Sequence, residues 1–387
     1  MPIQSPLGKL TTGAFLKRHW QKAPCVIREA VPDFAPPISA EELAGLACEE
    51  GVEARLVTKT RRRPGWSVRH GPFTEDNFAR LSTRNWTLLV QDVDKYVPQI
   101  ARLLDRFRFV PNWRIDDVMI SYATDGGGVG PHADAYDVFL LQAQGFKRWS
   151  ISTRPHANLE VPGLELKQVK DFHPQEEWLL APGDMLYLPP GVAHDGVAMG
   201  ESMTFSIGFR VPTDAEMLAD LSGWLLQRMN EDSRYSDPAL SDASNDPGLI
   251  SASARRRLRQ RMKGILTLKP DEFDQWFGRF ITEPKPWLAF APPRRRLDSS
   301  QMSALLKKSG LTRNPAALMS WAPGSGHRVH LFVNGQCYDL PDKLQQLVQY
   351  LARERDYSAD ALGHFSRSKA ALQLLTDMFN SGAIRRG

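Results

Sequence analysis

The chain has 387 residues, of which 42% are hydrophobic and 24% charged, so it can bury a core of ordinary globular size. Its three cysteines, Cys25, Cys48 and Cys337, are scattered, which argues against a disulfide framework and a zinc finger. The net charge of +5 is a mild bias toward an anionic or RNA-associated partner. The sequence contains neither a secretory signal nor an apolar run of about 18 residues. We therefore expect a cytoplasmic protein with no membrane association.

The N-terminal part alternates helical and strand patterns. Strand patterns are found at residues 25–27, 52–57 and 86–90, and helical apolar spacing at 11–20, 40–49 and 93–106. Ser39 and Glu42 have the spacing of a capping box, which predicts that the second helix begins at residue 40.

The middle of the chain, residues 117–210, changes to short strands separated by glycine and proline. Strands are predicted at 118–122, 138–142, 147–151, 178–181, 185–188 and 203–209. Many short strands between turns are typical of a barrel or jelly roll. The expected fold class is mixed α/β with a mainly β core.

The C-terminal part returns to helical patterns. We expect helices at 214–229, 251–266 and 271–280, with a polar loop at 231–250, and a proline-rich linker at 284–293. A helix at 300–309, a hairpin at 327–340 turned by Asn334-Gly335, and helices at 343–353 and 366–380 suggest a winged-helix-like module. The predicted domains are residues 1–211, 212–283 and 284–387.

The most informative motif is His132-Ala133-Asp134, followed much later by His194. Residues i and i+2 of a strand point to the same face, so His132 and Asp134 can both point into a barrel. Gly183, Pro189, Gly191 and His194 match the second cupin signature. Two imidazoles and one carboxylate are the ligand set of the facial triad that holds non-haem Fe(II) and leaves positions open for substrate and oxygen.

Neighbouring strands offer groups for an anionic cosubstrate. Lys147 follows a glycine turn, and a lysine that points into a barrel is costly unless it meets an anion. Ser121, Thr204 and Ser206 place small hydroxyls on otherwise apolar strands, as a carboxylate pocket requires. Each of these residues could instead be structural: Lys147 a surface charge, and each hydroxyl an ordinary strand residue.

Three further carboxylates, Asp125, Asp137 and Asp195, surround the first and last ligands in the sequence. Iron needs only one carboxylate, so these could pair with a cationic substrate side chain such as arginine or lysine. They could equally be solvated loop residues, and the odd offset of Asp137 from Asp134 would turn it outward from a barrel.

Residues 116–139, the segment Pro182-Gly-Asp-Met-Leu-Tyr-Leu-Pro-Pro-Gly191 and the strand Ser206-Ile-Gly-Phe-Arg210 resemble the bacterial JmjC-type ribosomal oxygenases. The resemblance extends to residues 41–47, 67–73, 85–91 and 275–281. It implies a JmjC double-stranded β-helix, a helical dimerisation region and a C-terminal winged helix. By position, His132, Asp134 and His194 fall on the iron ligands. Lys147 falls on the residue that pairs with 2-oxoglutarate, where near relatives carry arginine, and Thr204 stands where a relative has asparagine.

The resemblance implies an Fe(II)- and 2-oxoglutarate-dependent dioxygenase that uses O2 to hydroxylate a protein, with an arginine of a large-subunit ribosomal protein as the expected substrate. A histidine hydroxylase or a demethylase of the same superfamily is one alternative. A non-catalytic cupin-like module that binds nucleic acid is another, disfavoured by the intact triad and by the mixed charge of residues 343–353. We expect a homodimer, because helices between residues 214 and 280 carry Trp224, Leu225, Leu226, Trp276, Phe277 and Phe280.

Overall fold

The computed structural model describes residues 5–60, 65–155, 158–159, 168–230, 232–236, 248–288, 291–365 and 367–387. Contacts divide the chain into two compact units. Unit 1 comprises residues 1–211, 284–318 and 354–387, and unit 2 comprises residues 212–283 and 319–353. The chain passes between the units at both predicted domain boundaries, but residues 284–387 are shared between the two units instead of forming a separate one.

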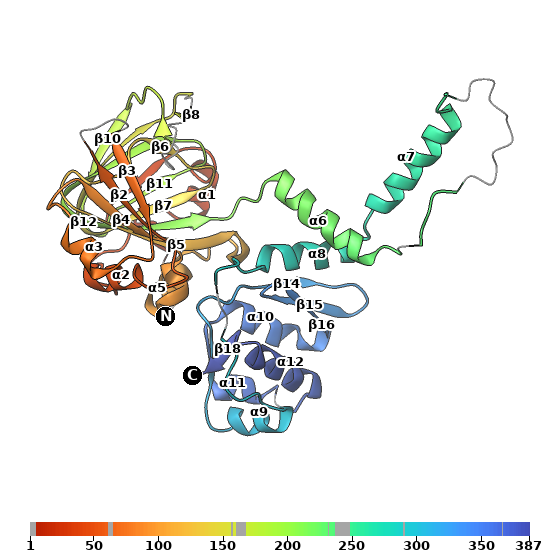
Figure 1. Ribbon diagram of the computed structural model, residues 1–387. Helices are drawn as coiled ribbons and strands as arrows, with labels where there is room; N and C mark the ends of the chain where they lie inside the picture. The colour runs from red at the N-terminus through yellow and green to blue at the C-terminus, as the bar shows by residue number, and fades with distance from the viewer. Residues whose placement is uncertain are drawn as a thin grey trace. The chain divides into compact units, whose positions relative to one another are not determined.

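The core of unit 1 is an antiparallel sheet of ten strands among the described residues, curled into a barrel (Figure 1). The strand order is β1-β11-β7-β12-β5-β4-β2-β3, with β10 paired to β7 and β6 paired to β12. This mainly β core confirms the predicted cupin-type fold class. The strands of this sheet are β1 (Cys25–Ile27), β2 (Ala54–Lys59), β3 (Trp66–His70), β4 (Trp86–Val90), β5 (Ile115–Ala123), β6 (His132–Ala133), β7 (Val138–Ser152), β10 (Glu176–Leu180), β11 (Met185–Leu188) and β12 (Ala193–Phe209).

The two long strands β7 and β12 pair along almost their full lengths and bend together. The register shifts between Met199 and Met203, opposite the turn in β7 at Gly145. Gly145 has φ +63°, and a Cβ there would lie 1.9 Å from the carbonyl oxygen of Glu201, so only glycine fits. The predicted strands at 138–142 and 147–151 are thus two halves of one bent strand.

The outer face of the sheet packs against the N-terminal helices through a fully buried aromatic cluster. Phe15 on α1 (Thr12–Arg18) lies 4.9 Å from Tyr187 and 5.4 Å from Phe139, measured between ring centroids. All three side chains are 0% exposed. Along β7, Phe139 and Leu141 face this core, so Val138 and Leu140 face the barrel interior.

The predicted helix at 93–106 is wrong as a single element. It is broken into α4 (Val93–Tyr96), α5 (Pro98–Leu103) and a 3₁₀ turn at Leu104–Phe107. Pro98 lacks an N–H and disfavours helical geometry at the preceding residue, so α4 ends there and Pro98 begins α5.

The predicted capping box is confirmed. Ser39 Oγ accepts from the Glu42 backbone N–H, and Glu42 Oε2 accepts from the Ser39 N–H, at the start of α2 (Ala40–Leu46). Other described elements of unit 1 are α3 (Glu75–Ala79), α9 (Ser299–Leu306), α11 (Ala359–Gly363), α12 (Lys369–Asn380), the pair β8 (Asn158–Leu159) and β9 (Gln168–Val169), and the sheet of β13 (Leu311–Arg313), β17 (Asp356–Tyr357) and β18 (Ile384–Arg386).

Unit 2 joins helices to a three-stranded sheet. Its elements are α6 (Asp214–Arg228), α7 (Ala252–Leu266), α8 (Pro270–Thr282), β14 (Met319–Pro323), β15 (Arg328–Val333), β16 (Gln336–Pro341) and α10 (Gln345–Arg353). Asn334 and Gly335 both have positive φ between β15 and β16, which confirms the predicted hairpin. The predicted loop at 231–250 lies partly outside the described residues. Residue 366, where the last predicted helix was expected to begin, also lies outside them. None of the helices in the described ranges is long and apolar enough to cross a membrane.

Candidate active site

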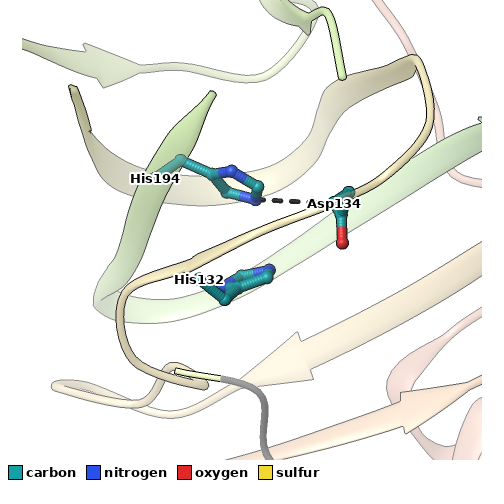
Figure 2. Close-up of side chains that lie close together, drawn as sticks. All are labelled: His132, Asp134 and His194. Carbon is teal, nitrogen blue, oxygen red and sulfur yellow. Dashed lines mark ion pairs between the residues drawn. The ribbon is translucent and has the colours of Figure 1, made fainter. Parts of the chain in front are cut away.

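The three predicted metal ligands lie together inside the barrel. His132 on β6 and His194 on β12 are paired across the antiparallel ladder, and Asp134 follows β6 directly (Figure 2). One ligand atom from each residue can be chosen so that all lie within 4.8 Å of one another. His194 Nε2 is 3.7 Å from Asp134 Oδ2, and the imidazole centroids are 4.2 Å apart.

Both imidazoles are held in the form that a metal requires. Nδ1 of His132 lies 2.8 Å from the carbonyl oxygen of Gly130, and Nδ1 of His194 lies 3.0 Å from that of Val192. A carbonyl only accepts, so each Nδ1 carries the hydrogen and each Nε2 keeps a lone pair for a cation. Burial, helped by the neighbouring His132, lowers the pKa of His194 to about 4, so His194 is neutral at physiological pH.

Lys147 is a buried cation with no carboxylate within salt-bridge distance among the described residues. It is 5% exposed, and its Nζ lies 4.9 Å from the ring centroid of Trp149. Burial lowers the pKa of Lys147 to about 8, against the opposing charge of Asp195. The predicted alternative of a surface charge is therefore wrong, and the side chain stands where an incoming anion would relieve its desolvation.

The predicted hydroxyls lie on adjoining strands. Thr204 on β12 is in register with Ser121 on β5 and with Gln142 on β7, and all three side chains are buried. Thr204 Oγ1 donates to Gln142 Oε1 at 3.2 Å, so its donor is already used inside the barrel. Ser206 is also buried, two residues along the same face of β12.

Gly196 makes room for the residues beside the metal ligands. It pairs with Trp149, and a Cβ at this position would lie 2.6 Å from the indole and 2.9 Å from Lys147 Cε. Any larger residue would displace the indole or the lysine stem. The indole centroid is 5.8 Å from that of His194, so Trp149 forms an apolar wall between the metal ligands and Lys147.

The three carboxylates predicted for substrate binding have separate environments. Asp125 Oδ2 is 2.6 Å from Arg84 Nη2, and its Oδ1 accepts from the Gly200 N–H. Asp195 follows His194 on β12, so its side chain leaves the opposite face of the strand. Burial raises the pKa of Asp195, against the neighbouring His132 and Lys59.

Asp137 is placed where a substrate cannot reach it. The residue is 0% exposed, and its carboxylate accepts from Tyr187 Oη at 2.6 Å and from Gln21 Nε2 at 3.0 Å. Arg114 Nη2 lies 3.5 Å away. The odd offset from Asp134 does turn the side chain outward, into the core beneath α1. Asp137 joins the N-terminal segment to the barrel and is not a residue of the barrel mouth.

Two residues that the sequence analysis missed, Asp117 and Tyr136, lie near one another. Asp117 shares a face of β5 with Met119 and Ser121, and a Cβ on Gly208 would be 3.3 Å from its Oδ1 and 3.9 Å from the Tyr136 ring. Burial, opposed by Lys285, raises the pKa of Asp117 to about 7. Burial together with Asp134 and Asp117 raises the pKa of Tyr136, whose side chain is still 42% exposed. The alternation of side-chain directions along the strand, from Ser121 back to Asp117, could have identified Asp117 from the sequence.

Known proteins are similar over the whole chain. Residues 102–217 match the model of the JmjC domain, and residues 257–385 match that of the ROXA-like winged helix. The ribosomal protein uL16 3-hydroxylase of Escherichia coli is 36% identical over 370 residues, 95% of each chain. The chain belongs to the JmjC ribosomal oxygenases. A probable ribosomal oxygenase of Haemophilus influenzae is 37% identical over 55% of this chain and 53% of its own.

Solved structures agree with this family. The X-ray structure of E. coli ycfD superposes with a TM-score of 0.88 at 35% identity, covering 98% of this chain and 99% of that one. A structure of E. coli YcfD in complex with cobalt and 2-oxoglutarate gives a TM-score of 0.84 at 35% identity, covering 98% of each chain. The JmjC oxygenase with a winged-helix domain, expected from the resemblance, is confirmed.

Replacing Asp137 by alanine should lower the free energy of unfolding by about 3–5 kcal/mol, because it leaves the Tyr187 hydroxyl, the Gln21 amide and Arg114 without their buried acceptor. Asp125→Ala is the matched control. Its half-exposed carboxylate bonds the exposed Arg84 and the Gly200 N–H, so the loss should be smaller, about 1–2 kcal/mol. Urea unfolding followed by circular dichroism measures both. Equal losses for the two variants would contradict a structural role for Asp137.

Proposed function

We propose that this ribosomal oxygenase is an Fe(II)- and 2-oxoglutarate-dependent hydroxylase acting on an arginine side chain of a large-subunit ribosomal protein in the cytoplasm. The observation that carries the proposal is the triad of His132, Asp134 and His194, with both Nε2 atoms free and the ligand atoms within 4.8 Å. This donor set suits ferrous iron. The relative named for uL16 hydroxylation supplies the substrate class.

The residues beside the triad would suit a dicarboxylate. Lys147 supplies a buried positive charge without an anionic partner among the described residues, and Ser121 and Ser206 supply hydroxyls, while the Thr204 hydroxyl donates to Gln142. A solved relative binds cobalt and 2-oxoglutarate. When bound, Fe(II), 2-oxoglutarate and O2 would together supply the oxidation that inserts one oxygen atom into a C–H bond, with succinate and carbon dioxide as co-products.

The protein's own residues hold and shield this chemistry. His132 and His194 would coordinate through Nε2, and the Asp134 carboxylate would offset part of the metal charge. Lys147 would pair with the distal carboxylate of the cosubstrate, which restores its lost solvation. Trp149 and a cluster of apolar side chains would keep water from that end of the site. The cluster comprises Val138, Leu140, Ile151, Leu180, Leu186, Leu188 and Val192.

Substrate recognition would rest on the carboxylates around Tyr136. Asp117 and Asp116 lie near Tyr136, whose exposed ring offers a face for a cation. A planar guanidinium can pair with a carboxylate bidentately, which an ammonium cannot match. Asp125 and Asp195 remain in the proposed substrate set, although Arg84 already pairs with Asp125. Asp137 is left out because it is buried and fully bonded.

A homodimer through unit 2 is part of the proposal. No residue of α6 or α7 is buried in the single chain, and several of their apolar side chains are exposed by two-fifths to two-thirds. These side chains are Leu218, Leu226, Leu258, Met262 and Leu266. Trp276 takes no part, since it is 3% exposed and its Nε1 donates to Asp220 within unit 2. Helices with such unpacked apolar faces are stable when a second copy covers them.

The enzyme is tested by peptide turnover with mass spectrometry. A ribosomal-protein peptide with arginine should gain one oxygen atom, and the same peptide with lysine should react far more slowly. The variant Asp134→Ala should abolish turnover of the arginine peptide, because the triad loses its carboxylate. Asp117→Asn should raise KM for the peptide and leave KM for 2-oxoglutarate unchanged. Equal rates for arginine and lysine peptides, or turnover of a histidine peptide alone, would contradict arginine hydroxylation and leave the oxygenase intact.

Lys147→Ala should raise KM for 2-oxoglutarate at least about tenfold, since a charge-assisted hydrogen bond is worth about 1.5–3 kcal/mol. The pKa of Lys147 is lowered to about 8, so the cation is present below that pH and is lost as the pH rises through it. The KM of the wild type should therefore rise above pH 8. Lys147→Arg is the control, because a guanidinium stays charged and should show no such rise. A pH-independent wild-type KM would place the anchor elsewhere.

The dimer is tested by light scattering at micromolar concentration. The wild type should have twice the mass of the chain, and Leu218→Asp combined with Leu226→Asp should give a monomer, because two charges would be buried in the interface. Leu179→Asp alters an equally exposed leucine on β10 of the barrel and should leave the dimer intact. A monomeric wild type would refute this part of the proposal.

A further inference from the structure

Trp149 carries a hydrogen-bond donor that the described protein leaves unused. The side chain is 5% exposed, and its Nε1 is buried with no acceptor among the residues described. A buried indole N–H usually finds a partner, and leaving one without a partner destabilises the folded protein. Phenylalanine would supply a similar apolar wall without an unpaired donor. We therefore expect the Trp149 N–H to have an acceptor that is not part of the described protein.

Among the described residues, no acceptor bonds the indole N–H, and apolar side chains pack around the ring. The side chains grouped with Trp149 are aliphatic, or in the case of Trp178 aromatic. On the β12 side, Gly196 lies against Cζ3 and Cη2, where a Cβ would come within 2.6–2.7 Å. These two atoms form the end of the indole farthest from the pyrrole ring. The N–H therefore points away from the β12 backbone.

The other polar groups near Trp149 belong to the proposed catalytic pocket. Lys147 Nζ lies over the ring at 4.9 Å from its centroid, and the His194 ring is 5.8 Å away. The Lys147 ammonium over the ring and the indole N–H are thus two buried donors of one neighbourhood, and neither has a hydrogen-bond acceptor among the described residues. The two oxygens of one carboxylate can accept from two such donors at once.

We propose that the Trp149 Nε1–H donates a hydrogen bond to the carboxylate of the bound cosubstrate that Lys147 also pairs with. This inference rests on the proposed 2-oxoglutarate site and adds a positioning residue to it. Lysine is a flexible point charge that can reach a carboxylate from many directions. A fixed indole donor beside it would orient the carboxylate and favour a dicarboxylate of one length.

The direct test is the ¹H–¹⁵N spectrum of the indole groups in the full-length protein loaded with Zn(II), a diamagnetic substitute for iron. The chain has ten tryptophans, and the Trp149 signal is identified by its loss in Trp149→Phe. Addition of 2-oxoglutarate should shift that signal downfield in the wild type. The signal of Trp178, which is paired with Trp149 across β10 and β7, should stay in place.

Calorimetry supplies the matched measurement. Trp149→Phe should weaken 2-oxoglutarate binding by about three- to tenfold, and Trp178→Phe should leave the Kd unchanged. If the wild type binds 2-oxoglutarate while the Trp149 signal does not move and Trp149→Phe keeps the wild-type Kd, a buried water satisfies the N–H and the inference is refuted. If the wild type binds no 2-oxoglutarate, the proposed function itself fails. Should Trp149→Phe not fold, the indole shift in the wild type, with its signal assigned through sequential backbone resonances, decides alone.

Discussion

The shared bend of β7 and β12 is the constraint on which the active site depends. Because the strands stay paired on both sides of the turn at Gly145, one sheet folds back over itself and brings the same faces of both strands into one interior. Lys147 and Trp149 then lie beside Gly196 and His194 on that face. A side chain at Gly145 would clash with the Glu201 carbonyl and open the ladder, so the backbone sets the position of Lys147, the proposed cosubstrate anchor.

The site gathers groups that are unfavourable without a ligand. Lys147 is a buried cation, the Trp149 N–H lacks an acceptor in the described chain, and the neutral His194 directs a lone pair into the interior. Each group raises the free energy of the protein by itself. A metal ion and a dicarboxylate together would satisfy all of them, so binding and stability should be coupled in this barrel. Such local departures from ordinary packing are common at functional sites.

Sequence patterns were sufficient where the chemistry is local and insufficient where it depends on distant partners. The spacing of His132 and Asp134, with the cupin signature before His194, predicted the triad, because strand alternation and a turn motif encode it directly. Asp137 looked equivalent to Asp125 in the sequence. Its partners, Gln21 and Tyr187, come from the turn after α1 and from β11, and only tertiary packing reveals them. The helix break at Pro98 was readable from the sequence and was overlooked.

The carboxylates near Tyr136 illustrate how the fold can prepare a site for a cation. Burial alone would lower the pKa of Lys285, but Asp117, Asp116 and Asp92 raise it, so this lysine holds its charge beside them. Its Nζ lies 2.8 Å from Asp92 and 3.9 Å from Asp117, whose Oδ2 also accepts from the Asp92 N–H. With its pKa near 7, Asp117 gains from a second cation on its free oxygen. A guanidinium arriving there would favour the ionised form, so the same burial that makes Asp117 unfavourable alone would strengthen substrate binding.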